Sequence, residues 1–139
     1  MPTSMGTERI LVTGGAGYIG SHTIVELLAA TGTEVVSVDN LSNSDGSAFR
    51  RIERITGRKV RNHTIDLCDP AALEALVAKE GPFTGVIHFA AFKSVPESMA
   101  HPHKYYHNNI LSLLNILEAA VKYRFRNFIF SSSCSVYGN

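Results

Sequence analysis

The 139-residue sequence has no tryptophan, only two cysteines and almost no net charge. Cys68 and Cys134 are far apart and match no metal-binding or redox spacing, so we expect both to be reduced thiols. A net charge of +1 provides no general field that would attract nucleic acid or an acidic membrane surface. No apolar stretch approaches the roughly 18 residues of a membrane span, and the first residues lack the apolar core of a signal peptide. These absences favour a cytoplasmic protein that binds neither nucleic acid nor membranes.

Hydrophobic residues are plentiful, at 45% of the sequence, which is enough for a sizeable core in a chain of one-domain length. We expect residues 1–8 to be a disordered leader and residues 9–139 to form one domain. Within that domain, short apolar runs alternate with segments in which apolar residues recur at helical spacing. Strands are predicted at Arg9–Thr13, Glu34–Val38, Lys59–Ile65, Gly85–Phe89 and Asn127–Ser131.

Four helices are predicted between these strands, at residues 17–30, 47–56, 70–79 and 102–123. Asp69 and Pro70 suit the start of the third helix, as its N-cap and first residue. The long fourth helix has apolar residues on one face: Ile110, Leu113, Leu114, Leu117 and Val121. Apolar strands that alternate with helices indicate a parallel sheet covered on both faces. Because crossovers are right-handed, we predict an α/β fold with a doubly wound parallel sheet of the Rossmann type and about five strands.

The segment TGGAGYIGSH follows the first predicted strand. Both Gly15-x-Gly17-x-x-Gly20 and the wider Gly14-x-x-Gly17-x-x-Gly20 match the dinucleotide-binding fingerprint, between a strand and a helix as it requires. Such glycines permit a tight turn, close approach of a pyrophosphate and close packing of the helix, whose N-terminus offers free N–H groups. Asp39 follows 19 residues after Gly20, at the end of the second strand, where an acid binds the adenosine ribose. This combination predicts a dinucleotide site.

The choice of cofactor depends on Asp39, because a carboxylate there would repel the 2′-phosphate of NADP. The sequence therefore favours NAD. A basic run further along could instead hold that phosphate, although such runs are more often the solvated face of a helix. It comprises Arg50, Arg51, Arg54, Arg58, Lys59 and Arg61.

More candidate ligand-binding residues follow the third and fourth predicted strands. Ligands of open α/β sheets bind outside the carboxyl ends of the strands. Asp66 could accept a hydrogen bond from adenine, and Lys93 could reach the phosphates. His88, inside the fourth strand, is interpreted as a core histidine. No group of histidines, cysteines and acids has the spacing of a metal site.

Five stretches together resemble the UDP-glucose 4-epimerase family of the extended short-chain dehydrogenase/reductase superfamily: TGGAGYIGSH, VDNLSNS, HFAAFKSVPES, YYHNN and NFIFSSSCSVYG. The resemblance spans residues 10–138. It implies an NAD-dependent isomerase of galactose metabolism that interconverts UDP-glucose and UDP-galactose by transient oxidation at C4 of the sugar. It also implies a UDP-sugar as the partner molecule and a possible homodimer.

The resemblance assigns roles to particular residues. Ser133 matches the family's active-site serine, which hydrogen-bonds the reacting sugar hydroxyl. Pro96 stands where many members have glycine, and we expect it to stiffen the loop between Lys93 and Glu97. The cofactor-binding residues implied are Gly14, Gly17, Tyr18, Ile19, Gly20, Asp39, Asn40, Leu41, Ser42, Asn43, Ser44, Asp66, Leu67, Phe89, Ala90, Ala91, Lys93 and Asn108.

The family mechanism needs a tyrosine and a lysine four positions apart on one helix face. None of the five tyrosines has a lysine four residues later. We therefore expect an incomplete NAD-binding domain, the N-terminal part of a longer enzyme without its C-terminal substrate domain, inactive by itself. Two alternatives remain. One is a nucleotide-sugar dehydratase or decarboxylase, although Ser133-Cys134-Ser135 lacks the acid that dehydratases usually carry there. The other is a non-catalytic NAD-binding regulatory module.

Overall fold

Short strands rich in β-branched and apolar residues form the centre of the structure, a computed structural model that describes residues 7–138. The sheet has five strands, all parallel, in the order β3-β2-β1-β4-β5. The strand order reverses beside β1, and a crevice for ligands is expected at this point of a doubly wound sheet. The strands are β1 (Arg9–Thr13), β2 (Glu34–Val38), β3 (Arg61–His63), β4 (Gly85–His88) and β5 (Asn127–Phe130).

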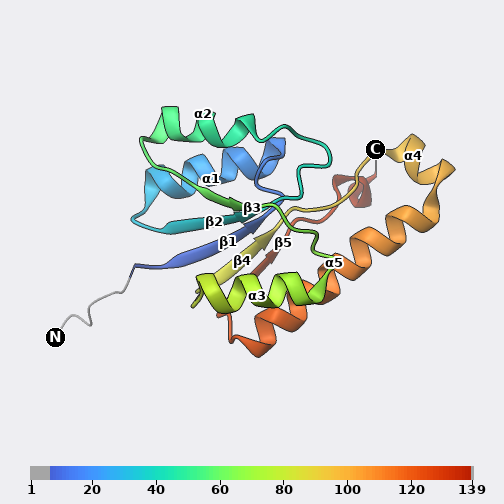
Figure 1. Cartoon of the computed structure of the whole chain (residues 1–139). Coiled ribbons are helices and arrows are strands. Elements are labelled where there is room, and N and C mark those ends of the chain that lie inside the picture. Colours follow the sequence, from blue (N-terminus) through green and yellow to red (C-terminus); the bar gives the residue numbers. More distant parts are fainter. Residues whose placement is uncertain (1–6, 139) are drawn as a thin grey trace.

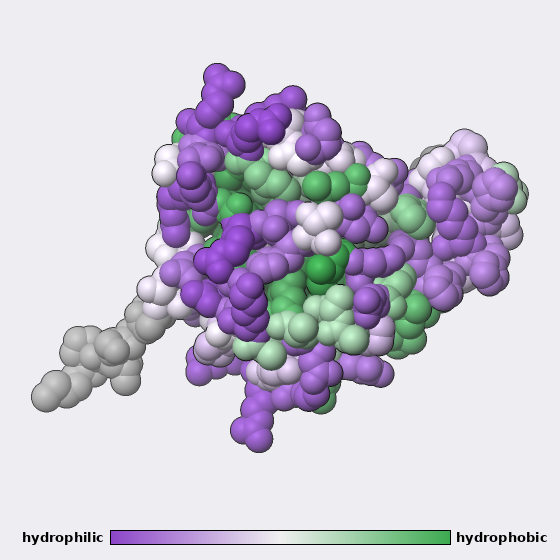
Figure 2. All heavy atoms as spheres, in the orientation of Figure 1, coloured by the Kyte–Doolittle hydropathy of each residue, from purple (hydrophilic) through white to green (hydrophobic). Residues whose placement is uncertain are grey.

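Helices cover both faces of this sheet. In Figure 1, α1 (Tyr18–Ala30) and α2 (Ser47–Thr56) lie above it, and α3 (Pro70–Glu80) and α5 (Pro102–Lys122) lie below. Successive strand residues point to opposite faces of the sheet. Leu11 therefore joins the core between the sheet and helices α3 and α5, while Val12 joins the core between the sheet and helices α1 and α2. Figure 2 shows hydrophilic residues over much of the outer surface in this view, with apolar residues visible between them. The predicted doubly wound sheet is confirmed.

Element boundaries differ from the prediction mainly after β3 and β4. Strand β3 is shorter than predicted, and a short helix, α4 (Val95–Ala100), follows β4 where we expected a loop. Pro96 lies in the first turn of α4, a position that proline favours because its missing N–H has no helical partner. Asp69 caps α3 as predicted and accepts hydrogen bonds from the amides of Ala71 and Ala72. A 3₁₀ helix, Cys134–Tyr137, follows β5.

Most of the apolar face predicted for the long helix does not pack on the sheet, although Leu113 contacts the core. Ile110, Leu114 and Val121 are exposed on the outside of α5. The buried face combines two large side chains, Tyr105 and Ile116, with small and polar ones: Ser112, Asn115, Ala119 and Ala120. The polar members are tolerated because loops that need hydrogen-bond partners lie against them, and Asn115 donates to the carbonyl of Leu67 at 2.8 Å.

The expected leader falls mostly outside the described residues. The carbonyl of its last residue, Glu8, accepts a hydrogen bond of 2.8 Å from the Glu34 amide. Within residues 7–138, no helix is long and apolar enough to cross a membrane.

Candidate functional site

The glycine turn between β1 and α1 packs so tightly that side chains would not fit. Gly14 has a φ of +71°, and a Cβ there would lie 2.9 Å from the Ala90 nitrogen. A Cβ on Gly20 would lie 2.2 Å from the Gly14 carbonyl oxygen. Gly17 begins α1 without a side-chain cap, so the first amides of the helix keep no side-chain partner. The turn thus presents backbone N–H groups and the positive end of α1 to the space beside it.

Asp39 joins the end of β2 to this turn. One carboxylate oxygen accepts from the Ala16 amide at 3.0 Å, and the other accepts from the Leu41 amide at 2.9 Å. Each oxygen can accept more than one hydrogen bond, so the carboxylate can also bind a ligand. The negative charge is therefore held beside the glycine turn by two backbone contacts.

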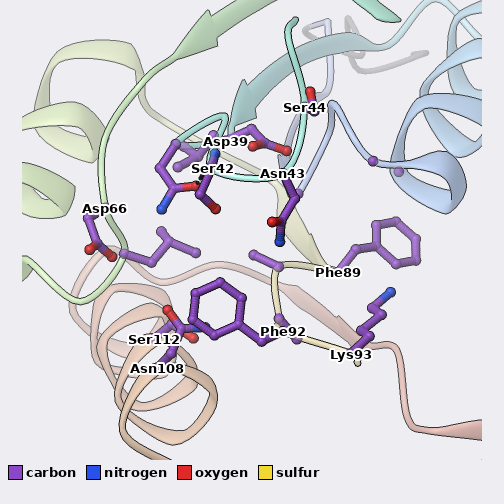
Figure 3. Close-up of a pocket in the computed structure, with 18 of the residues that line it drawn as sticks. Asp39, Ser42, Asn43, Ser44, Asp66, Phe89, Phe92, Lys93, Asn108 and Ser112 are labelled. Atoms are coloured by element: carbon purple, nitrogen blue, oxygen red, sulfur yellow. Dashed lines mark hydrogen bonds between the residues drawn. The ribbon is translucent and has the colours of Figure 1, made fainter. Parts of the chain in front are cut away.

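A cavity of about 580 Å³ lies along the carboxyl edge of the sheet. Figure 3 shows Asp39, Ser42 and Asn43 on one side of it, Asp66, Asn108 and Ser112 on another, and Phe89 and Lys93 opposite Asp66. All of the predicted cofactor-binding residues line it except Leu41: Gly14, Gly17, Tyr18, Ile19, Gly20, Asp39, Asn40, Ser42, Asn43, Ser44, Asp66, Leu67, Phe89, Ala90, Ala91, Lys93 and Asn108. Leu41 has a φ of 59° and contributes its amide to Asp39 rather than a side chain to the cavity.

Several lining residues were not predicted. They are Val38, Ile65, Phe92, Ser94, Glu97, Tyr105 and Ser112. The helix α5 contributes more than the Asn108 expected of it, because Asn109 and Asn115 hold the backbone of the two loops that form the walls. Polar residues between apolar ones along 102–123 were the available signal, but their partners lie far away in the sequence.

Ser133 lies three residues beyond the end of β5, and its side chain is exposed. Strand pairing continues briefly past β5, because the Ser131 amide donates to the His88 carbonyl at 3.2 Å. Ser133 does not belong to the residues that line the 580 Å³ cavity. Its assignment as the active-site serine stays a prediction.

A buried hydrogen bond lies directly beneath the cavity. The Thr13 hydroxyl is 2.7 Å from Nδ1 of His88 and also accepts from the amides of Phe89 and Ala90, both at 3.2 Å. The two amides occupy both lone pairs of the hydroxyl, so the hydroxyl donates its one proton to Nδ1 of His88. His88 then carries its own proton on Nε2. Burial lowers the pKa of His88 to about 4, so the ring is neutral at pH 7. The core histidine predicted at this position is confirmed.

The lowered pKa of His88 predicts that the folded chain loses stability in acid. The unfolded chain binds a proton at His88 near pH 6.5, whereas the folded chain does so only near pH 4, so stability falls as the pH drops between these values. From pH 7 to pH 5 the loss at this site should be about 2 kcal/mol, since one pKa unit corresponds to about 1.4 kcal/mol. Urea unfolding at both pH values would measure it. His88→Asn should largely remove this dependence, and the exposed control His107→Asn should retain it; equal dependence in both variants would contradict the assignment.

No group of three or more histidines, cysteines or acids within residues 7–138 could hold a metal ion. The site is instead a glycine turn, a helix N-terminus and a carboxylate around one cavity, at the switch point of a doubly wound sheet. These features define a dinucleotide-binding domain of the Rossmann class. The model of the NAD dependent epimerase/dehydratase family matches residues 10–139, and the chain belongs to this family.

The chain is also similar to individual named proteins. The UDP-glucose 4-epimerase uge1 of Schizosaccharomyces pombe is 52% identical over 99% of this chain, and the UDP-glucose 4-epimerase of Bacillus subtilis is 51% identical over 93%. Each match covers 38% of the relative, so the chain spans well under half of their length. The crystal structure of UDP-glucose 4-epimerase from Bifidobacterium longum in complex with NAD⁺ and UDP is 46% identical, with a TM-score of 0.88 over 94% of this chain and 38% of that one.

Proposed function

We propose that this chain is the NAD-binding part of a UDP-glucose 4-epimerase, an isomerase that interconverts UDP-glucose and UDP-galactose. The observation that carries the proposal is the single cavity shared by the glycine turn, Asp39 and Lys93. These are the groups needed for the pyrophosphate, the ribose and the phosphate charge. The NAD⁺ and UDP named for the Bifidobacterium longum structure support the same reading.

Each part of the site has a distinct task in binding NAD. The amides at the start of α1 donate to the pyrophosphate, and the close approach of Gly14 and Gly20 leaves room for it. Asp39 accepts from the ribose hydroxyls with the lone pairs that its two backbone contacts leave open. Lys93 adds positive charge, and Ser133 hydrogen-bonds the sugar hydroxyl at the carboxyl edge. A bound NAD⁺ would supply the hydride acceptor for the transient oxidation at C4 of the sugar.

Binding of NAD tests this function directly. Isothermal titration of the 139-residue chain should detect NAD⁺ binding and weaker NADP⁺ binding, because Asp39 repels a 2′-phosphate. Tighter binding of NADP⁺ would instead assign a phosphate-binding role to the basic run around Arg50. No binding of either nucleotide would refute the proposal for this chain.

Catalysis by the chain is a separate expectation. The 139 residues contain no tyrosine with a lysine four positions later, so we expect no conversion of UDP-galactose to UDP-glucose. A coupled assay for UDP-glucose would detect such conversion, with a complete UDP-glucose 4-epimerase as the positive control. Measurable turnover would show that residues of this chain supply the base.

Partners and location follow from the same function. A UDP-sugar is the substrate, and the cytoplasm is the expected compartment. The exposed apolar side chains of Ile110, Leu114 and Val121 on α5 favour a homodimer, because a soluble surface seldom leaves such a stripe uncovered. Sedimentation of the chain would test the association.

A further inference from the structure

Lys93 is the only cation that lines the cavity, among the residues that the structure describes, and its backbone is held on both sides. On one side, Asn109 accepts from the Phe92 amide at 2.8 Å and donates to the Phe92 carbonyl at 3.0 Å. On the other side, the Tyr105 hydroxyl accepts from the Ser94 amide at 3.2 Å. Both sets of hydrogen bonds come from α5, so this helix fixes the backbone position from which the Lys93 side chain extends.

Tyr105 is itself fixed by a second set of contacts. Its side chain is only 9% exposed, and its hydroxyl donates to Oε2 of Glu97 at 2.6 Å. Lys104 donates to Oε1 of the same carboxylate at 2.5 Å. The Tyr105 ring lies 5.6 Å from the Phe92 ring, and the Lys104 amine lies 4.7 Å from the centre of that ring. The hydroxyl therefore has one defined orientation, donating to Glu97 and accepting from Ser94.

The pKa shifts of Glu97 and Tyr105 agree with a Tyr105 hydroxyl that donates to Glu97. Hydrogen bonds from Lys104 and Tyr105 lower the pKa of Glu97, which keeps it an anionic acceptor. Burial and the neighbouring Glu97 raise the pKa of Tyr105, which keeps its proton in place. A neutral phenol can both donate and accept, so the two contacts of the hydroxyl are compatible.

We propose that Tyr105 is a positioning residue for Lys93: its hydroxyl joins the Ser94 amide to Glu97 and so holds the lysine-bearing segment against the cavity. The inference rests on the proposed NAD function, because Lys93 is taken to bind the cofactor. Tyr105 acts through the backbone of the 92–94 segment. Tyr105 also lines the cavity, but its hydroxyl is engaged by Ser94 and Glu97, so the proposed effect passes through the backbone.

A double-mutant cycle distinguishes positioning from general support of the fold. Tyr105→Phe keeps the ring against Phe92 and removes only the hydroxyl. It should weaken NAD⁺ binding about fivefold to tenfold in titrations, the range expected for losing one or two hydrogen bonds. In a Lys93→Met background, the same change should weaken binding less than twofold. Equal weakening in both backgrounds, or none in either, would overturn the proposal.

Tyr106→Phe is the matched control, because it removes the same group from the next residue, which is exposed and lines no part of the cavity. It should leave NAD⁺ affinity unchanged.

Amide hydrogen exchange of the ligand-free chain provides a measurement that does not depend on the cofactor. Exchange at Ser94 should be at least about fivefold faster in Tyr105→Phe and unchanged in Tyr106→Phe, since a lost hydrogen bond exposes the amide. Unchanged exchange at Ser94 in Tyr105→Phe would overturn the inference even if NAD⁺ binds. If the wild-type chain bound no NAD⁺, the proposed function would fail and this exchange experiment alone would decide whether Tyr105 holds the segment.

Discussion

Replacing Gly20 with alanine should weaken NAD⁺ binding by more than about 100-fold, the largest effect we expect of any single methyl group in this chain. The added Cβ would lie 2.2 Å from the Gly14 carbonyl oxygen and 2.9 Å from the Gly14 carbonyl carbon. These are backbone atoms, so relief requires α1 to move away from the glycine turn. Moving the helix misplaces the amides that face the pyrophosphate, and losing the hydrogen bonds of two such amides to a charged group is enough to cause a loss of this order.

Gly32→Ala is the matched control for this substitution. No atom lies within 4 Å of the position that its Cβ would occupy, and it lies in the turn after α1 rather than at the cavity. Its NAD⁺ affinity and thermal midpoint should match the wild type. Titration and thermal unfolding of both variants make the comparison, and wild-type affinity in Gly20→Ala would refute the pyrophosphate placement.

Replacing Glu80 with alanine should cost about 2 kcal/mol of folding stability, because it removes a buried carboxylate that accepts hydrogen bonds from a charged guanidinium. Glu80 is 4% exposed and accepts from Arg61 at 2.9 Å and 2.7 Å, while Nε2 of His63 lies 3.1 Å away. The cost stays moderate because the Arg61 side chain is 66% exposed, so its charge remains solvated when the carboxylate is removed. Glu74→Ala, which breaks an exposed pair with Lys122, should leave the stability close to that of the wild type.

The pH dependence of this effect follows from the pKa of Glu80. Burial raises it, but the hydrogen bonds and charge of Arg61 and the charge of His63 lower it more, so it lies below 4.5 in the folded chain. A lowered carboxyl pKa adds stability above the unfolded value, and this stability is lost as the pH falls through the folded value. The difference between wild type and Glu80→Ala in urea should therefore shrink below about pH 4.5. A constant difference from pH 7 to pH 3 would show that the charge contributes nothing.

Features that depend only on residues adjacent in the sequence could be predicted from the sequence. The strands β1 and β2, the helix α2 and the cap at Asp69 lie where apolar runs and capping chemistry placed them. The glycine turn and Asp39 were identified for the same reason, because tight turns and strand ends have local signatures. These local signals predicted the doubly wound sheet and the dinucleotide turn, whereas most of the other cavity residues were expected from the resemblance to the epimerase family.

Only the tertiary structure decided which face of α5 turns inward. Apolar spacing pointed to Ile110 and Leu114, yet the packed face carries Asn115, whose partner Leu67 is 48 residues away. The clamp of Asn109 on Phe92 and the contact between Tyr105 and Ser94 likewise join α5 to the loop after β4. Hydrophobic periodicity weighs each residue by its own preference for water, so it cannot detect a polar side chain whose burial is compensated by a distant backbone group. The sequence by itself therefore determined the doubly wound class of the sheet and the dinucleotide turn, and the packing of α5 against two loops decided how the cavity's far wall is built.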